Sequence, residues 1–394
     1  MIQRVAFVVQ RCGLEVNGGA ELLCRLVAEQ MARRAQTDVL TTCALDYLTW
    51  ANHYRPGEER IGDLRIRRFP VERPRDPASF GRLSERLRPR IGSLSVAEEE
   101  NWMREQGPWS PQLFKYIERH EDDYDAFIFF TYLYTTTYFG LPPVAEKAIL
   151  VPTAHDEWPI YFGMWDRLVE LPRALVFQTE EELAFMRRRF PRARLDGPIL
   201  GVAVEPPAAT DPHSFRKTYG IDASFVLYAG RLDPSKGVGE LLQNFESYRR
   251  ATGDLHTELV LVGKAAMEIP ATQGIRALGF LSEQHKWDAL AACEAFIMPS
   301  PYESLSIACL EAWSVGKPVL VNARSEVLAG QCRRSQGGLW YRDPDEFCAA
   351  LELLLGDAAV RGGLGAQGQR FVAANYRWPR IMDAYCELVS TLRR

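Results

Sequence analysis

The 394-residue chain has little of what marks several protein classes. Its eight cysteines include no Cys-x-x-Cys pair, which favours buried free thiols in a reducing cytosol over a disulfide framework or a zinc site. Its formal net charge of −4 argues against nucleic acid as the main partner. No apolar run approaches the length of a transmembrane helix, and the run at 5–9 is too short for a signal peptide. We therefore expect a cytoplasmic protein.

Positive charge is nevertheless clustered locally. Eleven arginines lie between Arg55 and Arg90, and the stretch 187–194 reads RRRFPRAR. One interpretation is a solvated surface. The other is a surface for an anionic acceptor, or for peripheral contact with the inner face of a membrane that carries a lipid-linked acceptor.

Short apolar runs alternate with helical patterns along the whole chain. The runs are continuously apolar, which is typical of parallel strands that helices cover on both faces. They lie at 5–9, 37–42, 64–69, 126–130, 148–152, 174–179, 225–230, 258–263, 295–300 and 318–322. The pattern predicts an α/β protein with two tandem doubly wound, Rossmann-like domains that face a cleft.

The alternation breaks once, in the stretch 197–212, which is rich in Pro, Gly and Ala. We expect one domain over 1–203 and a second over 204–376. Residues 70–112 interrupt the first domain, either as a lid or acceptor-binding insertion or as a helical surface elaboration. Because ligands of doubly wound sheets bind beyond the carboxyl ends of the strands, the cleft is the expected site.

The loop AGRLDPSKG at 229–237 follows a predicted strand and precedes a helix that we expect to begin near Val238. Its two cations, Arg231 and Lys236, would face the cleft together. Two cations near a helix N-terminus suit a doubly charged anion such as a diphosphate. The alternative is two surface cations on a loop.

Two carboxylates, Glu303 and Glu311, are eight positions apart in SPYESLSIACLEAW at 300–313. Eight helical positions span roughly 12 Å, about the reach from a sugar to a ribose across a diphosphate. We expect the N–H groups of residues 304–306 (Ser304, Leu305 and Ser306) at the start of a helix, where they can receive phosphate oxygens. The alternatives are an acid in the first helical turn for Glu303 and a surface position for Glu311.

The first domain offers two further candidates. Gly18 and Gly19 follow the first strand and allow a donor phosphate or sugar to approach the backbone closely. His155 follows the strand at 148–152, so it lies at a carboxyl end of that sheet. It is either a site residue or a hydrogen-bonded loop histidine, and the sequence does not rank Asp156 and Glu157 beside it.

Two short motifs resemble known binding motifs but lack the structural context that such motifs need. The stretch 363–368, GLGAQG, has dinucleotide-binding spacing but follows a helical run instead of a strand. The stretch 123–125, DYD, resembles a metal-binding motif but precedes its strand, at the wrong end of the sheet. We expect no metal site.

Several stretches between 225 and 322 together resemble the family-4 retaining glycosyltransferases of GT-B architecture. They are YAGRLDPSKG, LVLVG, LGFL, the ESLS turn with its two glutamates, and AWSVGKPVL, in the order that the family shows. The first domain resembles the family more weakly. The resemblance implies transfer of a sugar from a nucleotide donor with retention of configuration, and it implies that 377–394 is a helix that crosses back to the first domain.

The resemblance also assigns roles. Arg231 and Lys236 would bind the diphosphate, Glu303 the donor sugar and Glu311 the ribose, while a histidine at the place of His155 would touch the donor sugar. Further donor contacts would come from Gly263, Leu278, Gly279 and Phe280, the last three around the base. No cofactor is expected beyond the nucleotide-sugar co-substrate, with a UDP-sugar favoured over a GDP-sugar. A nucleotide-sugar hydrolase or epimerase, and a non-catalytic nucleotide-sugar-binding protein, stay open as alternatives.

Overall fold

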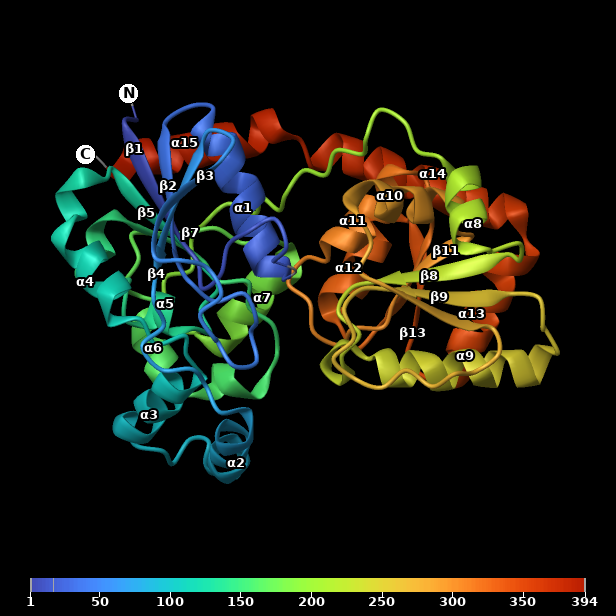
Figure 1. Ribbon diagram of the computed structural model, residues 1–394, viewed down its shortest axis with the longest axis horizontal. Coiled ribbons are helices and arrows are strands. Elements are labelled where there is room, and N and C mark those ends of the chain that lie inside the picture. Colours follow the sequence, from blue (N-terminus) through green and yellow to red (C-terminus); the bar gives the residue numbers. More distant parts are fainter. Residues whose placement is uncertain (1, 17, 393–394) are drawn as a thin grey trace. The chain divides into compact units, whose positions relative to one another are not determined.

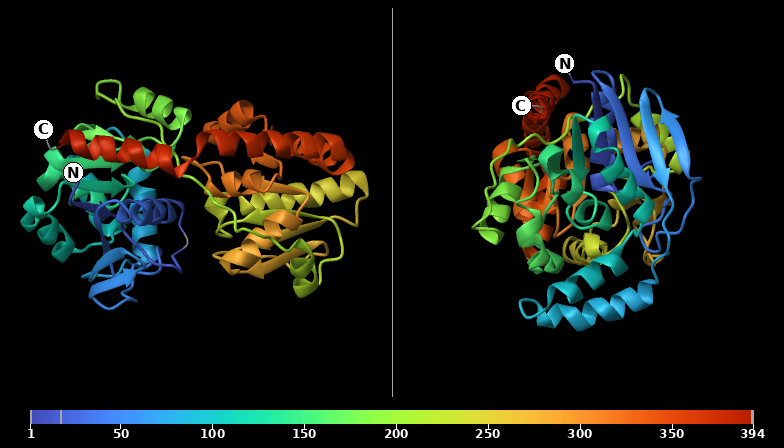
Figure 2. Two further views of the ribbon diagram at one scale, coloured as in Figure 1. Left: turned by 90° about the horizontal axis from the view of Figure 1, so that it is seen from above. Right: turned by 90° about the vertical axis from the view of Figure 1, so that its left-hand side faces the viewer.

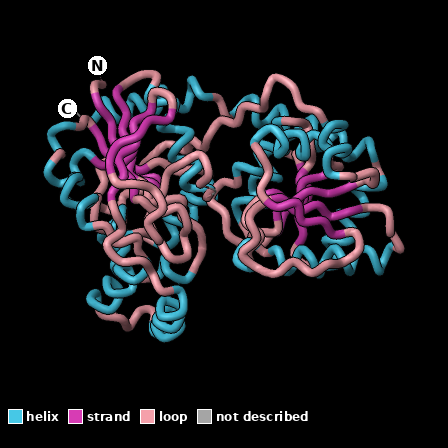
Figure 3. Tube along the Cα trace, in the orientation of Figure 1, coloured by secondary structure: helices cyan, strands magenta, loops and turns pink. Residues whose placement is uncertain are grey.

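The computed structural model describes residues 2–16 and 18–392, which form two compact units. Unit 1 takes the described chain up to Val202 and again from Trp378, and unit 2 takes Ala203–Arg377. Each unit has a central sheet with helices around it (Figure 3). The prediction of two doubly wound α/β domains is confirmed.

The sheet of unit 1 has seven strands in the order β3-β4-β2-β1-β5-β6-β7 (Figure 1). The strands are β1 Arg4–Val8, β2 Gln36–Thr42, β3 Gly57–Ile61, β4 Leu64–Phe69, β5 Ala126–Phe130, β6 Ala148–Val151 and β7 Ala174–Leu175. All neighbours are parallel except β3 and β4. The edge strand β3 was not predicted, because its sequence GEERI is charged and mostly exposed.

Helices α1 Gly19–Ala32, α4 Pro111–Arg119, α5 Thr135–Tyr138, α6 Met164–Leu168 and α7 Glu180–Arg189 accompany this sheet. So does α15 Trp378–Leu392, drawn red on unit 1 in Figure 2. It lies against α1, and Tyr385 of α15 is fully buried. Arg34, just after α1, and Asp383 form an ion pair of 2.7 Å. As far as the described residues reach, α15 thus belongs to unit 1.

The segment 70–112 forms helices α2 Pro77–Leu87 and α3 Val96–Gln106, which pack against each other at one end of unit 1. Trp102 of α3 is buried, and its ring contacts the rings of Phe80, Trp158 and Phe162. Glu99 is also buried and accepts the N–H groups of residues 163 and 164 at 2.9 and 2.7 Å. The segment is thus part of the core of unit 1.

Unit 2 has a fully parallel six-stranded sheet in the order β10-β9-β8-β11-β12-β13. The strands are β8 Phe225–Ala229, β9 Glu258–Val262, β10 Ile275–Gly279, β11 Ala295–Met298, β12 Val319–Asn322 and β13 Gly338–Tyr341. The helices are α8 Pro212–Tyr219, α9 Val238–Thr252, α10 Glu283–Ala292, α11 Ile307–Ser314, α12 Glu326–Ser335, α13 Pro344–Gly356 and α14 Ala358–Asn375. The two outer strands, β10 and β13, were not predicted; unlike the inner strands, both are only partly buried.

The sequence GLGAQG at 363–368 lies inside α14 and not in a loop after a strand. A side chain at Gly365 would collide with the carbonyl of Gly316, and one at Gly368 with the ring of Trp313. These glycines let α14 pack closely on α11 and its following turn.

Candidate functional site

The strand order of unit 2 reverses between β8 and β11. From β8 the chain proceeds outward to β9 and β10, and from β11 it proceeds outward on the other side to β12 and β13. At such a switch point the loops after the two strands separate and leave a crevice, which is where doubly wound sheets bind ligands. The two loops are 230–237 and 299–306, and they hold six of the fourteen predicted site residues, among them Arg231, Lys236 and Glu303.

Lys236 and Glu303 meet across this switch point. Lys236 Nζ donates to Glu303 Oε1 at 2.7 Å, and the two side chains are 27% and 14% exposed. Arg231 lies in the same loop as Lys236, with its Nη1 3.8 Å from Asp233 Oδ2. The structure therefore brings together charges from loops that are 67 residues apart in sequence.

Tyr228 of β8, which the sequence analysis did not identify, stabilises the loop 230–237. Its hydroxyl donates to the carbonyl of Arg231 at 2.7 Å. Burial raises the pKa of this phenol well above its ordinary value, and the nearby Glu303 carboxylate raises it further. The hydroxyl consequently stays a donor and fixes the backbone at Arg231.

Glycines allow the loops of this site to pack backbone against backbone. Gly237 has a φ of +74°, and a side chain there would collide with the carbonyl of Pro299. Gly263 has a φ of +141°, and a side chain there would collide with the carbonyl of Gly230. The predicted donor residue Gly263 thus has a structural task as well.

The three predicted base-contacting residues lie at the end of the edge strand β10. The Gly263 N–H donates to the carbonyl of Gly279 at 2.8 Å, which joins this strand end to the loop after β9. Leu278 is half-buried, Gly279 is exposed, and the Phe280 side chain is 64% exposed. A ring so exposed has a face available for stacking.

The predicted start of α11 is wrong. The helix begins at Ile307, because Ser306 adopts a left-handed conformation with a φ of +67°. Ser304 and Leu305 belong to the preceding turn, and Ser306 is the N-cap residue. For the same reason, Glu303 is not an acid in the first helical turn.

Glu311 is buried in α11, so the alternative of a surface position is also wrong. Its Oε1 accepts from Lys286 Nζ of α10 at 2.7 Å, and Lys286 also lies 2.8 Å from the Glu283 carboxylate. Burial raises the pKa of the Glu311 carboxyl, and the Lys286 ammonium opposes this shift. Sequence reasoning missed Lys286, because it lies on a helix outside every motif.

In unit 1, the loops after β5 and β6 show unusual backbone. Thr131 and Thr153 follow these neighbouring strands with φ of +61° and +48°. β-Branched residues rarely adopt such values, and the strain is typical of functional sites. The Thr131 N–H donates to Val151 O at 2.9 Å and the Tyr132 N–H to Pro152 O at 3.1 Å, which joins the two loops.

His155 lies in the second of these loops, beside Glu157. His155 Nε2 is 3.4 Å from Glu157 Oε1, which also accepts the Tyr132 hydroxyl at 2.9 Å. Asp156 instead accepts the Tyr161 hydroxyl at 2.7 Å. Of the two acids, Glu157 is therefore the one that contacts His155.

Glu182, a buried acid that contacts the loop of His155, was not predicted as a functional residue. Glu182 of α7 is 1% exposed, and its two oxygens accept the N–H groups of Ala154 at 2.7 Å and Gln178 at 2.6 Å. Burial raises its pKa to about 8, although these hydrogen bonds oppose the shift. Glu182 stands in a run of three glutamates that resembles an exposed first helical turn, and only the tertiary contacts single it out.

Gly18 and Gly19 lie after β1, beside the switch point of unit 1 between β1 and β5. A side chain at Gly18 would collide with the carboxylate of Glu21, which pairs with Arg11 at 2.9 Å. A side chain at Gly19 would meet no atom within 4 Å. Of the two glycines, only Gly19 leaves open space beside the backbone.

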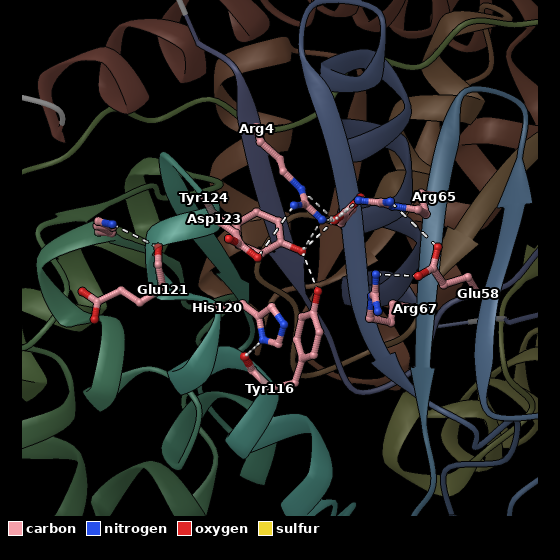
Figure 4. Close-up of polar contacts among 11 residues, drawn as sticks. Arg4, Glu58, Arg65, Arg67, Tyr116, His120, Glu121, Asp123 and Tyr124 are labelled. Atoms are coloured by element: carbon pink, nitrogen blue, oxygen red, sulfur yellow. Dashed lines mark hydrogen bonds and ion pairs between the residues drawn. The ribbon is translucent and has the colours of Figure 1, made fainter.

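The residues of the motif DYD lie at the opposite, amino end of the sheet, where they form hydrogen bonds within the protein (Figure 4). Asp125 accepts the N–H of Arg4 at 3.1 Å, and the Tyr124 hydroxyl donates to Asp38 at 2.6 Å. Asp38 is buried and also accepts from the guanidinium groups of Arg4 and Arg65. Among residues 2–16 and 18–392, no three His, Cys, Asp or Glu side chains are grouped so as to hold a metal.

None of the helices in the described part of the chain has the length and apolar character needed to cross a lipid bilayer.

Comparison with known proteins gives a family match in unit 2. Residues 223–357 match the family described as glycosyl transferases group 1. The lipopolysaccharide core biosynthesis glycosyltransferase LpsE of Rhizobium meliloti is 29% identical over 181 residues, 43% of this chain and 51% of that protein. A GDP-mannose-dependent mannosyltransferase of Corynebacterium glutamicum is 28% identical over 191 residues, 44% and 49% of the two chains. The matched stretches thus span about half the length of these relatives.

Solved structures match over the whole chain. Sucrose-phosphate synthase of Thermosynechococcus elongatus has a TM-score of 0.73 at 17% identity, over 99% of both chains. HepE of Anabaena, in complex with UDP and glucose, has a TM-score of 0.69 at 15% identity, over 99% of this chain and all of that chain. The chain therefore has the two-domain α/β fold of the GT-B class, and a stretch of unit 2 is similar to glycosyl transferases group 1.

Proposed function

We propose that the chain is a retaining, metal-independent glycosyltransferase. It would move a hexose from a nucleotide-diphosphate sugar to an acceptor hydroxyl in the synthesis of a polysaccharide, glycolipid or other glycoconjugate. The observation that carries the proposal is the Lys236–Glu303 pair at the switch point of a domain that matches glycosyl transferases group 1. The UDP-containing HepE structures support a UDP-sugar, whereas the name of the Corynebacterium relative supports a GDP-sugar.

In this mechanism the departure of the diphosphate is the difficult step. Negative charge accumulates on the leaving oxygen as its bond to the anomeric carbon breaks. The cations of Arg231 and Lys236 are held in place beforehand, so they stabilise this charge without reorganisation. They would take the role that a divalent metal plays in other transferases.

Glu303 would act on the sugar once the donor has bound. In the free protein it neutralises Lys236. A diphosphate carries more charge and would draw the ammonium toward itself, which leaves the carboxylate oxygens to accept from sugar hydroxyls. The pair thus keeps both groups positioned before the donor arrives.

The acceptor oxygen would attack from the face that the diphosphate leaves, which preserves the configuration. A new bond forms between the anomeric carbon and the acceptor oxygen, and the acceptor proton passes to the departing phosphate. His155, held by Glu157, is proposed to contact the donor sugar near the reacting carbon, and Glu311 the ribose.

The test is release of UDP or GDP from a panel of nucleotide sugars, with and without candidate acceptors. We expect Lys236→Ala to lower kcat by about a hundredfold or more, because the lost charge matters most in the transition state. Lys217→Ala, a change of an exposed lysine on α8, serves as the control. Near-normal turnover by Lys236→Ala, or complete loss of wild-type activity with a chelator, would contradict the mechanism.

The same assay separates the alternatives. Nucleotide release that does not depend on any acceptor would indicate a hydrolase. Epimerised donor without transfer would indicate an epimerase, and binding without turnover would indicate a non-catalytic protein.

A further inference from the structure

Unit 1 contains a cavity of about 660 Å³ that the proposed donor chemistry does not use. Its walls come from the segment 91–99, from the stretch 156–166 that follows β6, and from the last turns of α7. The volume falls within the range of about 300–1,000 Å³ typical of small-molecule sites. The cavity therefore has room for a ligand of its own.

The charged groups of the wall already have partners within the protein, and the oxygens of its carboxylates have lone pairs left to accept further hydrogen bonds. Arg189 pairs with Asp166 at 2.9 Å, and its remaining N–H groups donate to the carbonyls of residues 160 and 162 at 2.8 and 3.0 Å. Asp156 accepts the Tyr161 hydroxyl. Glu99 is committed to two backbone N–H groups.

The balance of these charges disfavours an anionic ligand. The lining holds three carboxylates, Glu99, Asp156 and Asp166, against the two guanidinium groups of Arg188 and Arg189. A phosphate site needs an excess of donors and positive charge. A wall of carboxylate acceptors beside guanidinium donors instead suits hydroxyl groups, because each hydroxyl both donates and accepts.

The rest of the lining is apolar and partly aromatic. The Tyr161 side chain is 42% exposed, and Leu94 and Phe185 line the same cavity. An alternation of hydroxyl-binding groups with a ring face and aliphatic side chains matches the surface of a saccharide, in which hydroxyls surround C–H faces.

The position of the cavity connects it with the proposed reaction. Asp156 in its wall directly follows His155 in sequence. The opposite wall is fixed to this stretch, because Glu99 of α3 binds the N–H groups of residues 163 and 164. The inserted helices thus complete a site beside the histidine loop.

We infer that this cavity binds the acceptor of the transfer and that the acceptor is an uncharged saccharide. The role of the bound saccharide as acceptor rests on the proposed function, whereas the binding of a saccharide in this cavity does not.

The experiment uses Leu94→Trp in the full chain, which would fill the cavity. Leu255→Trp is the matched control, because Leu255 is 67% exposed in unit 2. The probes are neutral mono-, di- and trisaccharides and their phosphorylated counterparts, observed by saturation-transfer NMR without donor. We expect neutral sugars to bind to wild type and to the control, and Leu94→Trp to bind them about tenfold more weakly or worse. With donor present, the acceptor KM should rise by a similar factor while the donor KM stays unchanged.

Tighter binding of the phosphorylated sugars, or unchanged binding by Leu94→Trp, would overturn the inference. If Leu94→Trp lowers thermal stability, Tyr161→Ala replaces it, because it removes the exposed ring without adding volume. Saccharide binding that depends on the cavity, in a protein that transfers nothing, would refute the proposed function and keep the site. Transfer with an acceptor KM that neither variant changes would refute the site and keep the function.

Discussion

The carboxyl ends of the two sheets carry their polar groups in different ways. In unit 2, partly exposed side chains, Lys236 and Glu303, lie on loops directly after their strands. In unit 1, the buried Glu182 and the strained Thr153 act on the backbone of the loop that holds His155. Unit 2 thus presents charged side chains that a ligand can contact. In unit 1, by contrast, the buried Glu182 stabilises the backbone of one loop.

The largest expected effect tests whether unit 2 also depends on a buried carboxylate. Lys286→Met leaves Glu311 buried without its cation, because the neighbouring Glu283 is an acid. A buried charge that has lost its partner costs about 3 kcal/mol or more. We expect a corresponding loss in the free energy of unfolding, measured by urea denaturation.

A double variant is the control for this prediction. Lys286→Met combined with Glu311→Leu replaces the pair by apolar groups, so most of the stability should return. Donor affinity should not return if Glu311 binds the ribose. Normal donor binding by the double variant would show that Glu311 does not contact the donor.

The second prediction concerns the buried acid of unit 1. Because the pKa of Glu182 is raised to about 8 from 4.5, the folded state holds a proton that the unfolded state has released between these values. The contribution of Glu182 to stability is thus present at acid pH and is lost as the pH rises through 8. Glu182→Gln has no such proton to lose. From about pH 5 to about pH 9, the Tm of wild type should fall relative to that of Glu182→Gln by about 5 °C or more.

Glu180→Gln provides the matched control, since Glu180 is exposed in the first turn of the same helix. Its Tm should follow that of wild type across the same pH range. If wild type and Glu182→Gln keep a constant difference in Tm, the carboxyl is ionised throughout this pH range. Glu182 would then not be the protonated buried acid that distinguishes unit 1 from unit 2.

The smallest expected effect measures the strain at Thr153. Glycine accepts a φ of +48° without penalty, whereas a side chain in the left-handed region costs about 1–2 kcal/mol. Thr153→Gly should therefore destabilise by about 1–2 kcal/mol less than Thr41→Gly, the same change at a buried position in β2. Equal losses in chemical denaturation would show that the loop stores no strain.

The fold could be predicted from the sequence to the extent that each strand was apolar. Continuous apolar runs marked most of the inner strands of both sheets, but the edge strands β3, β10 and β13 carry polar or half-exposed residues and gave no such signal. The start of α11 was misplaced because nothing local distinguishes the left-handed Ser306 from a helical serine.

The candidate site was predictable where it lies in a local motif. The loop with Arg231 and Lys236 and the turn with Glu303 stand directly after strands, so the topology alone brings them together. Lys286 and Glu182 act across 25 and 28 residues, and nothing in their own neighbourhoods marks them. Burial decides their roles, and burial is a property of the finished fold.

The return of the chain to unit 1 at Trp378 has a consequence for biosynthesis. Unit 2 is continuous in sequence and can finish folding as soon as it has left the ribosome. Unit 1 must wait with an uncovered patch on α1 until the stretch that carries Tyr385 has been made, because α15 buries that patch. The first unit to be translated is thus the last to be completed, and for the whole time that unit 2 is being synthesised a chaperone could recognise its uncovered face.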